Sequence, residues 1–374
     1  MPSVNHDLDP SPRLLLGPGP SLVAPRVLRA MATPLVGHLD PDFIAILADI
    51  QTMLRMVFQT GNRLTLAVSG TGTSAMEAAL ANLVEPGDPV LACVHGFFGD
   101  RLAEIALRQG AKVERLEAPW GQVFAVDVIE AALKARPAKV VTLVHAETST
   151  GARQPDIAAV ADACHRYDAL LVLDCVTSLG GLPVEIDAWG VDVAYSASQK
   201  CLSAPPGMAP ITIGPRAEER IRSRRTPVSS FYLDLTLLGK YWSDKPAYHH
   251  TAPISLAYAL REALRLVKEE GLEARFDRHR RNAELLWRGL DALGLPLLIP
   301  EPLRLPSLST PTLPAGIDDA GVRRRLLQDY NIEIAGGFGP LAGAVWRIGL
   351  MGHSSRRENV VTLLGALHEI LGAR

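Results

Sequence analysis

Short apolar runs alternate with amphipathic stretches between residues 64 and 214. The runs are LTLAVSG, PVLACV, KVVTLVH, ALLVLDC, VDVAYSA and APITIG. The stretches between them include SAMEAALANLV, DRLAEIALRQG, DVIEAALKA and DIAAVADACHRY. Apolar runs of this length, separated by helices, predict an α/β fold with a mostly parallel sheet covered by helices on both faces.

A different pattern begins near Gly271. A long charged helix is followed by two strand-like segments and a closing helix: LEARFDRHRRNAELLWRGLDALG, PSLSTPTL, AVWRIGLMG and SRRENVVTLLGALHEILG. A chain of 374 residues exceeds the size at which one hydrophobic core usually stops growing. We therefore predict a large domain over residues 14–270 and a smaller C-terminal α+β domain over residues 271–374. Residues 1–13, rich in Pro and Asp, are expected to form an N-terminal arm that lies on another surface.

Composition excludes several classes of protein. The chain is 48% hydrophobic and 21% charged, with a formal net charge of −2, which is typical of a soluble globular protein. It has no basic excess that would neutralise a nucleic-acid backbone. The N-terminus does not resemble a signal peptide, the C-terminus LLGAR is not a peroxisomal signal, and no apolar run reaches the roughly 18 residues of a membrane helix. We expect a cytoplasmic protein with neither nucleic-acid nor membrane partners.

Cysteine and histidine positions do not indicate a metal site. The four cysteines are Cys93, Cys164, Cys175 and Cys201. They are too few and too scattered for a disulfide framework or a zinc site, so we expect buried core thiols. His249 and His250 are adjacent and cannot both face one metal from a single element. We assign them, and His145, to structural roles, and we interpret RAEERIRSRR (216–225) as a solvated helix face.

A glycine-rich turn follows the first apolar run. In an open α/β sheet the ligand binds beyond the carboxyl ends of the strands. The segment SGTGTSAMEAAL combines glycines, hydroxyl residues and the start of a helix, whose free N–H groups can bind an anion. A capped turn without a ligand is the alternative. Gly70-x-Gly72-x-x-Ala75 also fits the loose dinucleotide fingerprint, but the next run lacks the acid that would hold a ribose, so we retain only a phosphate.

An acid and a lysine follow two later runs. Asp174 directly follows the apolar run ALLVL. A carboxylate there is costly unless a cation or hydrogen-bond donors contact it, and capping of the following loop is the alternative role. Lys200 follows VDVAYSASQ and stands alone among serines, a glutamine and a Pro-Pro-Gly turn. Thr148 and Ser149 follow a further run. Together with the anion-binding turn, these residues suit a cofactor with a phosphate, a basic ring nitrogen and an aldehyde, which is pyridoxal phosphate.

The same segments resemble a known family. LLLGPGPS, VFQTGNRLTLAVSGTGTSAMEAAL, HAETSTG, LDCVTSLGG, SASQKCLSAPPG, YHHTAP and WRIGLMG make the chain similar, over nearly its whole length, to class V aminotransferases of fold type I. The branch it resembles is that of the alanine–glyoxylate and serine–pyruvate enzymes. The resemblance implies the fold of a pyridoxal-phosphate-dependent transferase. It also implies ping-pong transamination between alanine or serine and glyoxylate or pyruvate.

The resemblance further assigns roles to individual residues. It implies that Lys200 forms the Schiff base with the cofactor and that Asp174 is the partner of the ring nitrogen. Val176 is expected to pack against one face of the ring. Thr148 is expected near the ring hydroxyl and the substrate. Arg347, in the apolar context VWRIGL, is expected to clamp the substrate carboxylate, which guanidinium groups bind bidentately; an ordinary strand arginine is the alternative.

The phosphate ligands implied by the resemblance are Gly72, Thr73 and Gln199. Some animal relatives have histidine where this chain has Thr73. Phe98 occupies the place of the tryptophan that often covers the ring in relatives, and it can stack but lacks the indole donor.

Two further residues implied by the resemblance concern the neighbouring subunit. Tyr248 and Thr251, in YHHTAP, are expected to reach the phosphate of the partner chain, which predicts a homodimer with shared active sites. Other activities remain open: ureidoglycine–glyoxylate transamination, a pyridoxal-phosphate lyase, or a non-catalytic protein that binds a phosphorylated ligand. A desulfurase would need a cysteine in the C-terminal half, and none follows Cys201.

Overall fold

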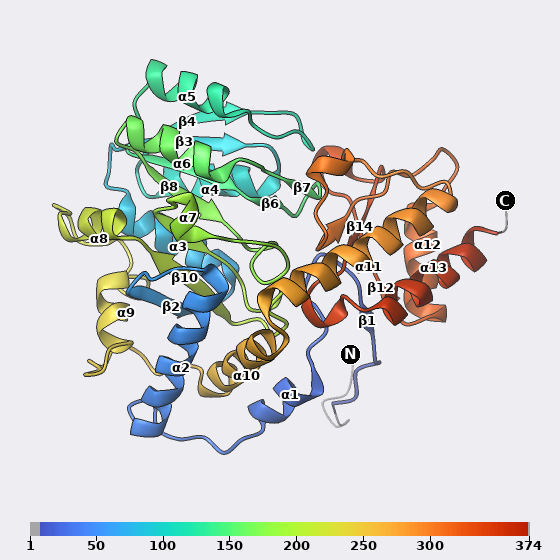
Figure 1. The fold of residues 1–374 in the computed structure, drawn as a ribbon, viewed down its shortest axis with the longest axis horizontal. Coiled ribbons are helices and arrows are strands. Elements are labelled where there is room, and N and C mark those ends of the chain that lie inside the picture. The colour runs from blue at the N-terminus through green and yellow to red at the C-terminus, as the bar shows by residue number, and fades with distance from the viewer. Residues whose placement is uncertain (1–7, 373–374) are drawn as a thin grey trace, which may run out of the picture.

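The computed structural model describes residues 8–372, and its central feature is a seven-stranded sheet (Figure 1). The strand order is β2-β10-β9-β8-β5-β3-β4. The strands are β2 (Leu64–Ser69), β3 (Pro89–Val94), β4 (Lys112–Glu117), β5 (Val140–Val144), β8 (Leu170–Asp174), β9 (Val193–Tyr195) and β10 (Met208–Ile213).

The predicted apolar runs are confirmed as β2, β3, β5, β8, β9 and β10. Every residue of β5, β8, β9 and β10 is buried, so both faces of the middle of the sheet are covered, as a continuous apolar run requires. Strand β4 was missed because its sequence KVERLE is polar. It lies at the edge of the sheet, pairs only with β3, and has no fully buried residue.

Strand direction brings several chain segments to one edge of the sheet. Strands β3, β4, β5, β8 and β9 run parallel to one another, whereas β10 is antiparallel to both β9 and β2. Strand β2 therefore runs in the same direction as β9. The carboxyl ends of β2, β5, β8 and β9 consequently lie at the same edge, where ligands of open α/β sheets bind.

Helices pack around this sheet and build the larger hydrophobic core. Helix α3 contacts β9 and β10, α4 contacts β3 and β5, α6 contacts β8, and α2 contacts β2 and α10. The helices are α1 (Pro25–Met31), α2 (Pro41–Phe58), α3 (Gly72–Leu83), α4 (Phe97–Arg108), α5 (Val126–Ala135), α6 (Ile157–Arg166), α7 (Ile186–Trp189), α8 (Pro215–Arg222), α9 (Leu235–Tyr241) and α10 (Ile254–Glu270).

A second core forms beside the first and contains most of the C-terminal elements. Figure 1 shows α11 running from the sheet toward this part of the molecule, where α12, α13 and β14 lie. Its helices are α11 (Leu272–Ala292), α12 (Asp319–Asp329) and α13 (Arg357–Leu371), and its three-stranded sheet has the order β11 (Leu308–Ser309), β14 (Trp346–Gly349), β13 (Ala335–Gly336). Three single-turn 3₁₀ helices are η1 (Glu301–Leu303), η2 (Gly339–Leu341) and η3 (Gly352–Ser354).

The start of the chain packs with this second core. Strand β1 (Leu14–Leu15) pairs in parallel with β12 (Ile332–Glu333), and Leu16 is buried among C-terminal residues. Arg13, the residue before β1, donates a hydrogen bond of 2.7 Å to the carbonyl of Leu327. Residues 1–7 of the predicted arm lie outside the described residues, and the division into domains at residue 271 stays a prediction.

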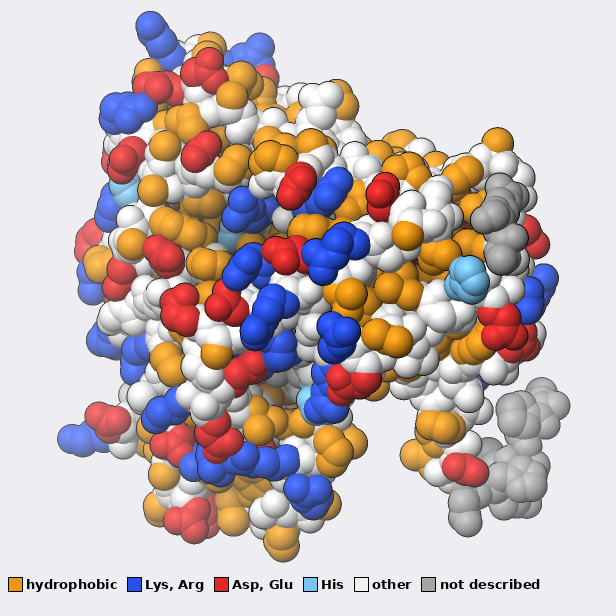
Figure 2. Space-filling view, turned by 45° about the vertical axis from the view of Figure 1, so that its right-hand side comes forward, with side chains coloured by type: hydrophobic (Ala, Val, Ile, Leu, Met, Phe, Trp, Pro, Cys, Tyr) orange, Lys and Arg blue, Asp and Glu red, His pale blue; other side chains and the backbone are white. Residues whose placement is uncertain are grey.

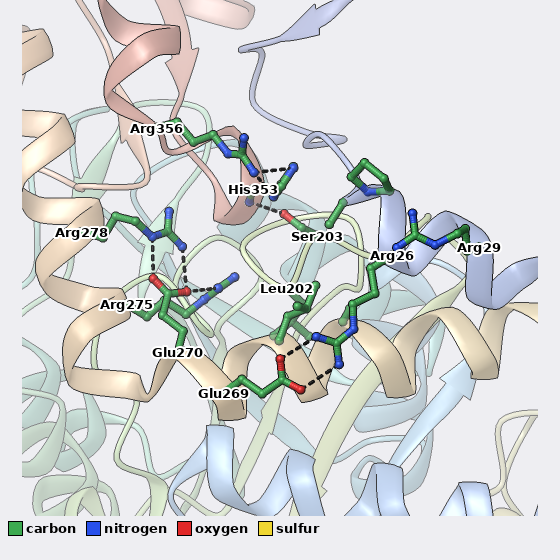
Figure 3. A pocket seen from close by; sticks show the side chains of 14 residues that line it. Arg26, Arg29, Leu202, Ser203, Glu269, Glu270, Arg275, Arg278, His353 and Arg356 are labelled. Atoms are coloured by element: carbon green, nitrogen blue, oxygen red, sulfur yellow. Dashed lines mark hydrogen bonds and ion pairs between the residues drawn. The ribbon is translucent and has the colours of Figure 1, made fainter.

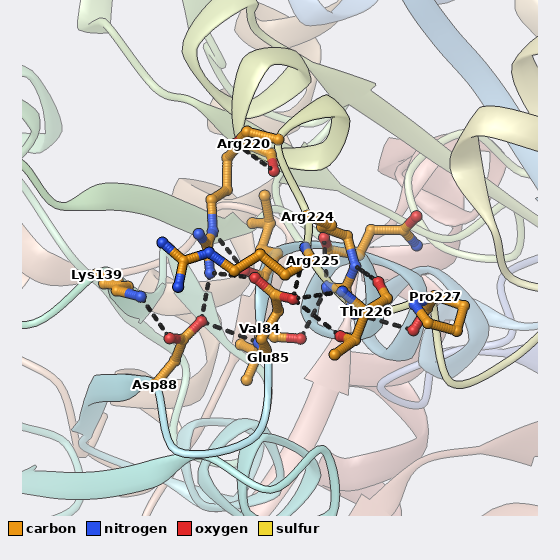
Figure 4. A network of polar contacts seen from close by, with 12 residues as sticks. Val84, Glu85, Asp88, Lys139, Arg220, Arg224, Arg225, Thr226 and Pro227 are labelled. Carbon is orange, nitrogen blue, oxygen red and sulfur yellow. Dashed lines mark hydrogen bonds and ion pairs between the residues drawn. The ribbon is translucent and has the colours of Figure 1, made fainter.

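A polar network ties α8 to the loop before β3 (Figure 4). Arg220 donates to Asp88 and lies 3.5 Å from Glu85, while Lys139 contacts Asp88 at 2.6 Å. Arg224 donates to the carbonyl of Val84 at 2.8 Å. The interpretation of RAEERIRSRR as a solvated helix face is therefore wrong for three of its arginines, Arg216, Arg220 and Arg224, because buried carboxylates and carbonyls draw them inward.

The surface carries both signs of charge. On the face shown in Figure 2, basic and acidic side chains are interspersed over the part that contains the sheet. Within residues 8–372, no helix combines the length and the apolar composition needed to cross a membrane.

Candidate active site

A buried carboxylate stands at the centre of the carboxyl edge. Asp174 ends β8, is 1% exposed, and lies in register with Tyr195 of β9. Its Oδ1 accepts a hydrogen bond from the Val176 N–H at 2.8 Å, and its Oδ2 accepts one from the Tyr195 hydroxyl at 2.8 Å. Burial raises the pKa of Asp174 to about 6, although both hydrogen bonds act against that rise. A cation beside this carboxylate would favour its ionised form.

Lys200 lies in the turn after β9 and reaches the N-terminal segment. Its Nζ donates a hydrogen bond to the carbonyl of Pro18. Its chain packs on Gly19, where a Cβ would lie 2.6 Å from the lysine Cδ and where φ is +105°. Only glycine adopts this conformation without strain and leaves room for the lysine. Burial lowers the pKa of Lys200 to about 8, and the charge of Asp174 partly opposes this effect.

The segment GPGPS holds the turn that carries the lysine. Ser21 donates its Oγ to the Lys200 carbonyl at 2.8 Å, and its N–H donates to the Gln199 carbonyl at 2.9 Å. The sequence pointed to this segment only through the family resemblance. A contact between residues so far apart in the chain leaves no local pattern.

The turn that is predicted to bind an anion lies at the end of β2. Helix α3 begins at Gly72, and the N–H groups of a first helical turn have no partner within the helix. A Cβ on Gly72 would lie 3.0 Å from Ala197 and 3.4 Å from Val176, so the backbone approaches its neighbours closely here. Arg101 adds positive charge, with Nη1 3.3 Å from Thr73 Oγ1.

The side chain of Gln199 also fits a phosphate. Its Oε1 is buried, and no group within the described residues hydrogen-bonds to it. Because the two ends of an amide exchange by a half-turn, this position can equally present an unused N–H donor. The residues at this edge therefore fit the phosphate of the predicted cofactor.

Arg347 approaches the site from β14. It is 8% exposed, and its Nε donates to the Gly336 carbonyl at 2.9 Å. Nη1 of Arg347 lies 3.5 Å from the carbonyl oxygen of Thr148. The Thr148 hydroxyl in turn lies 2.5 Å from the Thr177 hydroxyl. Burial lowers the pKa of Arg347 to about 10, which leaves the guanidinium charged at neutral pH.

Aromatic rings connect Arg347 to the start of α4. The guanidinium carbon lies 4.2 Å from the centre of the Phe338 ring, which meets Phe97 edge-to-face at 4.8 Å. Phe97 in turn meets Phe98 edge-to-face at 5.5 Å. Phe338 was missed, because the segment GGFGP has no periodicity that would place its ring.

The buried carboxylate of Glu147 holds the backbone at Phe98. Glu147 accepts from the Ser149 N–H at 2.9 Å, from the Ser149 hydroxyl at 2.5 Å, and from the Phe98 N–H at 3.3 Å. Gly96 leaves room for it, since a Cβ there would lie 2.4 Å from the carboxylate carbon. Glu147 was also missed, although an acid placed directly after an apolar run was a usable signal.

The two residues expected to serve the neighbouring chain are on the surface. Tyr248 is 66% exposed, and Thr251 is exposed. Between them, His250 Nε2 lies 2.9 Å from Ser69 Oγ at the end of β2, and His249 lies 3.1 Å from the Phe231 carbonyl. This loop therefore borders the carboxyl edge of the sheet.

The cysteines and the remaining histidine have structural surroundings, as predicted. All four thiols are buried and unpaired, and burial raises their pKa values. Cys175 and Cys201, which flank site residues, are therefore poor nucleophiles. His145 is buried beside Ser178, 3.0 Å from its Oγ, and burial lowers the pKa of His145 to about 3.

Comparison with known proteins identifies the family. The model of the family described as aminotransferase class-V matches residues 14–351. The (S)-ureidoglycine–glyoxylate transaminase of Bacillus subtilis is 44% identical, over 96% of this chain and 90% of that protein. The alanine–glyoxylate aminotransferase of Mus musculus is 43% identical, over 96% of this chain and 87% of that protein.

A solved structure agrees with the fold. The crystal structure of alanine–glyoxylate aminotransferase from Nostoc sp. superposes with a TM-score of 0.97 at 53% identity, covering 99% of this chain and 98% of that chain. This likeness confirms the predicted fold type I. Class V aminotransferases depend on pyridoxal phosphate. The chain described here belongs to the class V aminotransferases.

Proposed function

We propose that this chain binds pyridoxal phosphate and transfers the amino group of alanine or serine to glyoxylate or pyruvate. The observation that carries the proposal is a buried lysine whose pKa is lowered to about 8, near the buried acid Asp174 and the cationic Arg347. The names of the similar proteins support the acceptor, because both curated relatives act on glyoxylate.

The cofactor would be held by residues that follow five strands, β2, β3, β5, β8 and β9. Gly72, Thr73 and Gln199 would bind its phosphate, Asp174 its ring nitrogen, and Lys200 its aldehyde carbon. Val176 and Phe98 would pack on the ring, and Thr148 would lie near its hydroxyl. When bound, this cofactor withdraws electrons from the substrate Cα and carries the amino group between the two half-reactions.

Asp174 keeps a positive charge on the ring nitrogen. The Tyr195 hydroxyl and the Val176 N–H fix both carboxylate oxygens, so the carboxylate cannot rotate away from its partner. In a buried site an anion strongly favours the protonated form of a neighbouring nitrogen. By holding that nitrogen protonated, Asp174 would strengthen the electron withdrawal that the bound cofactor supplies.

Lys200 moves the proton. With a pKa of about 8, about a tenth of this amine is neutral at pH 7 and can take the proton from the substrate Cα. The ammonium formed in this way would hold that proton and would be the group positioned to return it. The Pro18 carbonyl and Gly19 hold the side chain on the side from which it acts.

Arg347 orients both substrates. An amino acid and the 2-oxo acid derived from it present the same carboxylate, and a guanidinium can bind it with two parallel hydrogen bonds. The Gly336 carbonyl and the Phe338 ring fix the plane of the guanidinium before substrate arrives. A positioned cation reduces the entropy lost on binding.

The rings beside Arg347 favour a donor with a small side chain over one with a ureido group. Phe338 and Phe97 offer carbon surfaces, and the nearby Glu147 carboxylate is already occupied by the Ser149 and Phe98 donors. A ureido group placed there would leave its polar atoms unpaired. Ureidoglycine–glyoxylate transamination remains the second candidate, because 44% identity to the Bacillus subtilis enzyme favours it.

A donor panel tests the proposal. Alanine, serine and ureidoglycine are each assayed with glyoxylate and with pyruvate, and their kcat/KM values are compared. We expect alanine or serine with glyoxylate to give the highest value. A value for ureidoglycine that is at least about tenfold higher would reverse the assignment of the donor.

A further inference from the structure

A second cavity opens between α1, the junction of α10 and α11, and the segment after β14 (Figure 3). Its volume is about 660 Å³, which is within the range of small-molecule binding sites. Leu202 and Ser203, the second and third residues after Lys200, form part of its lining. The cavity therefore adjoins the turn that carries the lysine without being part of the candidate active site.

Arginine dominates the lining of this cavity. The arginines are Arg26, Arg29, Arg275, Arg278 and Arg356. Three of them pair with carboxylates, and two of these three share the single carboxylate of Glu270. Arg26 pairs with Glu269 at 2.6 Å. Glu270 forms ion pairs with Arg275 at 2.6 Å and with Arg278 at 2.5 Å.

The other two arginines leave an excess of positive charge. Within residues 8–372, Arg29 forms no ion pair and no side-chain hydrogen bond. Arg356 has one exposed carboxylate, Glu358, at 3.6 Å, and lies 2.8 Å from the ring of His353. Burial and then the charge of Arg356 lower the pKa of His353 to about 4, which agrees with a positive potential here. Figure 3 shows Arg356 and His353 on one side of the cavity and Arg29 on the other.

We propose that this cavity binds a small phosphorylated metabolite with two or more negative charges. Guanidinium groups match phosphate oxygens in both charge and geometry. The volume is too large for a single inorganic phosphate, and Leu202, Ala263 and Leu266 provide apolar surface for the uncharged part of a ligand. Glu269 and Glu270 repel anions, so the phosphate groups lie toward Arg29 and Arg356.

Occupancy of this cavity acts on the turn that carries Lys200. Ser203 has a left-handed backbone with φ of +56°, and its Oγ accepts from the His353 N–H at 2.7 Å. The same Oγ lies 2.9 Å from Ser21 Oγ, which donates to the Lys200 carbonyl. Arg275 donates to the Cys201 carbonyl at 2.6 Å. A ligand bound here braces this turn and slows the loss of cofactor.

Calorimetric titration tests the binding site. The protein carries its cofactor, free cofactor is removed beforehand, and the probes are fructose 1,6-bisphosphate, pyrophosphate and inorganic phosphate. We expect fructose 1,6-bisphosphate and pyrophosphate to bind saturably and more tightly than inorganic phosphate. The double variant Arg29→Gln with Arg356→Gln should bind them at least about tenfold more weakly. The control, Arg281→Gln with Arg324→Gln, removes the same charge from exposed positions outside the cavity and should bind like the parent.

Three results would overturn the proposal. The first is that neither fructose 1,6-bisphosphate nor pyrophosphate binds saturably. The second is that the two double variants bind these probes with equal affinity. The third is a rate of cofactor loss on dilution, followed by visible absorbance, that saturating bisphosphate leaves unchanged; this would refute the coupling to Lys200. Calorimetry needs no transamination, so a failure of the proposed function would not alter the binding result.

Discussion

Burial displaces the pKa values of Asp174 and Lys200 toward each other. The pKa of the acid rises to about 6 and that of the lysine falls to about 8, in both cases mainly because a charge is costly in a buried site. Both groups can therefore change protonation state near neutral pH, which suits proton transfer. The displaced pKa of Asp174 also has a consequence for stability.

Without cofactor, ionised Asp174 should destabilise the protein. A carboxyl whose pKa is raised from 3.8 to about 6 on folding stabilises the fold while it is protonated, and this stabilisation is lost as pH rises from about 4 to about 6. The corresponding free energy is roughly 3 kcal/mol. Relative to Asp174→Asn, the free energy of unfolding of the cofactor-free parent should fall by this amount between about pH 4 and pH 7. Urea unfolding at several pH values measures it.

A difference between the two proteins that is independent of pH would contradict this prediction, because it would mean that Asp174 titrates normally. The variant provides an independent check with cofactor present. Asp174→Asn should retain bound cofactor but turn over slowly, since the neutral amide cannot keep the ring nitrogen protonated.

Arg347 should serve the amino donor and the acceptor equally. Arg347→Ala removes a charge-assisted pair of hydrogen bonds, so kcat/KM should fall by roughly one to two orders of magnitude for both substrates. Arg347→Lys keeps the charge but not the two parallel bonds, and should fall between the parent and the alanine variant. Steady-state kinetics with each substrate varied in turn measures these losses. A loss confined to one substrate would argue against a shared clamp.

The sequence singled out candidate site residues that follow apolar runs and missed the residues that contact and position them. Lys200 and Asp174 were conspicuous because polar groups at strand ends are costly without a partner. Tyr195 was hidden inside an apolar run, and its role depends on the register between β8 and β9. Glu147 and Phe338 depend on contacts between distant segments, which no local pattern encodes.

At the scale of elements, the attachment of α8 depends on Arg220. Its guanidinium neutralises Asp88 and Glu85, both largely buried, and also donates to the Leu83 carbonyl at 3.2 Å. Arg220→Ala leaves Asp88 with Lys139 as its remaining ion-pair partner and removes the cation that contacts Glu85, and it should lower the free energy of unfolding by about 3 kcal/mol. Chemical denaturation measures the change.

Arg222→Ala, on the same helix, is the matched control. Within residues 8–372, Arg222 forms one ion pair, with Glu219, and both side chains are largely exposed, so the change should stay within about 1 kcal/mol. Equal losses for the two variants would show that the network around Asp88 contributes little to stability.

Helices and buried strands could be predicted from the sequence, whereas edge elements could not. The amphipathic stretches became α3, α4, α5 and α6 with bounds close to those expected. Strand β4 was missed because an edge strand can expose polar side chains on both faces. Pairing of Leu14–Leu15 with β12 was also unpredictable, since two short segments at opposite ends of the chain carry no shared signal.

At the scale of the whole molecule, we predict a homodimer with shared sites. Tyr248 and Thr251 are exposed in a single chain, on a loop that borders the carboxyl edge of the sheet. Lys200→Ala homodimers should be inactive, and Thr251→Ala homodimers should hold cofactor weakly. In a mixed dimer, one site would combine an intact Lys200 with an intact Thr251. Mixing the variants under conditions of subunit exchange should therefore raise activity above that of either one.

Exchange must be verified separately, for example with differently labelled subunits. If labelled subunits exchange and activity stays at the level of the two variants, each chain supplies its own phosphate ligands. The shared-site prediction would then be wrong.

Lys200 should perform a half-reaction with an amino donor alone. Protein loaded with pyridoxal phosphate is mixed with alanine in the absence of any acceptor, and the pyruvate released is counted against active sites. We expect one pyruvate per site, with a matching change in visible absorbance, and no measurable pyruvate from Lys200→Ala on the same timescale. Release of pyruvate by Lys200→Ala at the parent rate would contradict it.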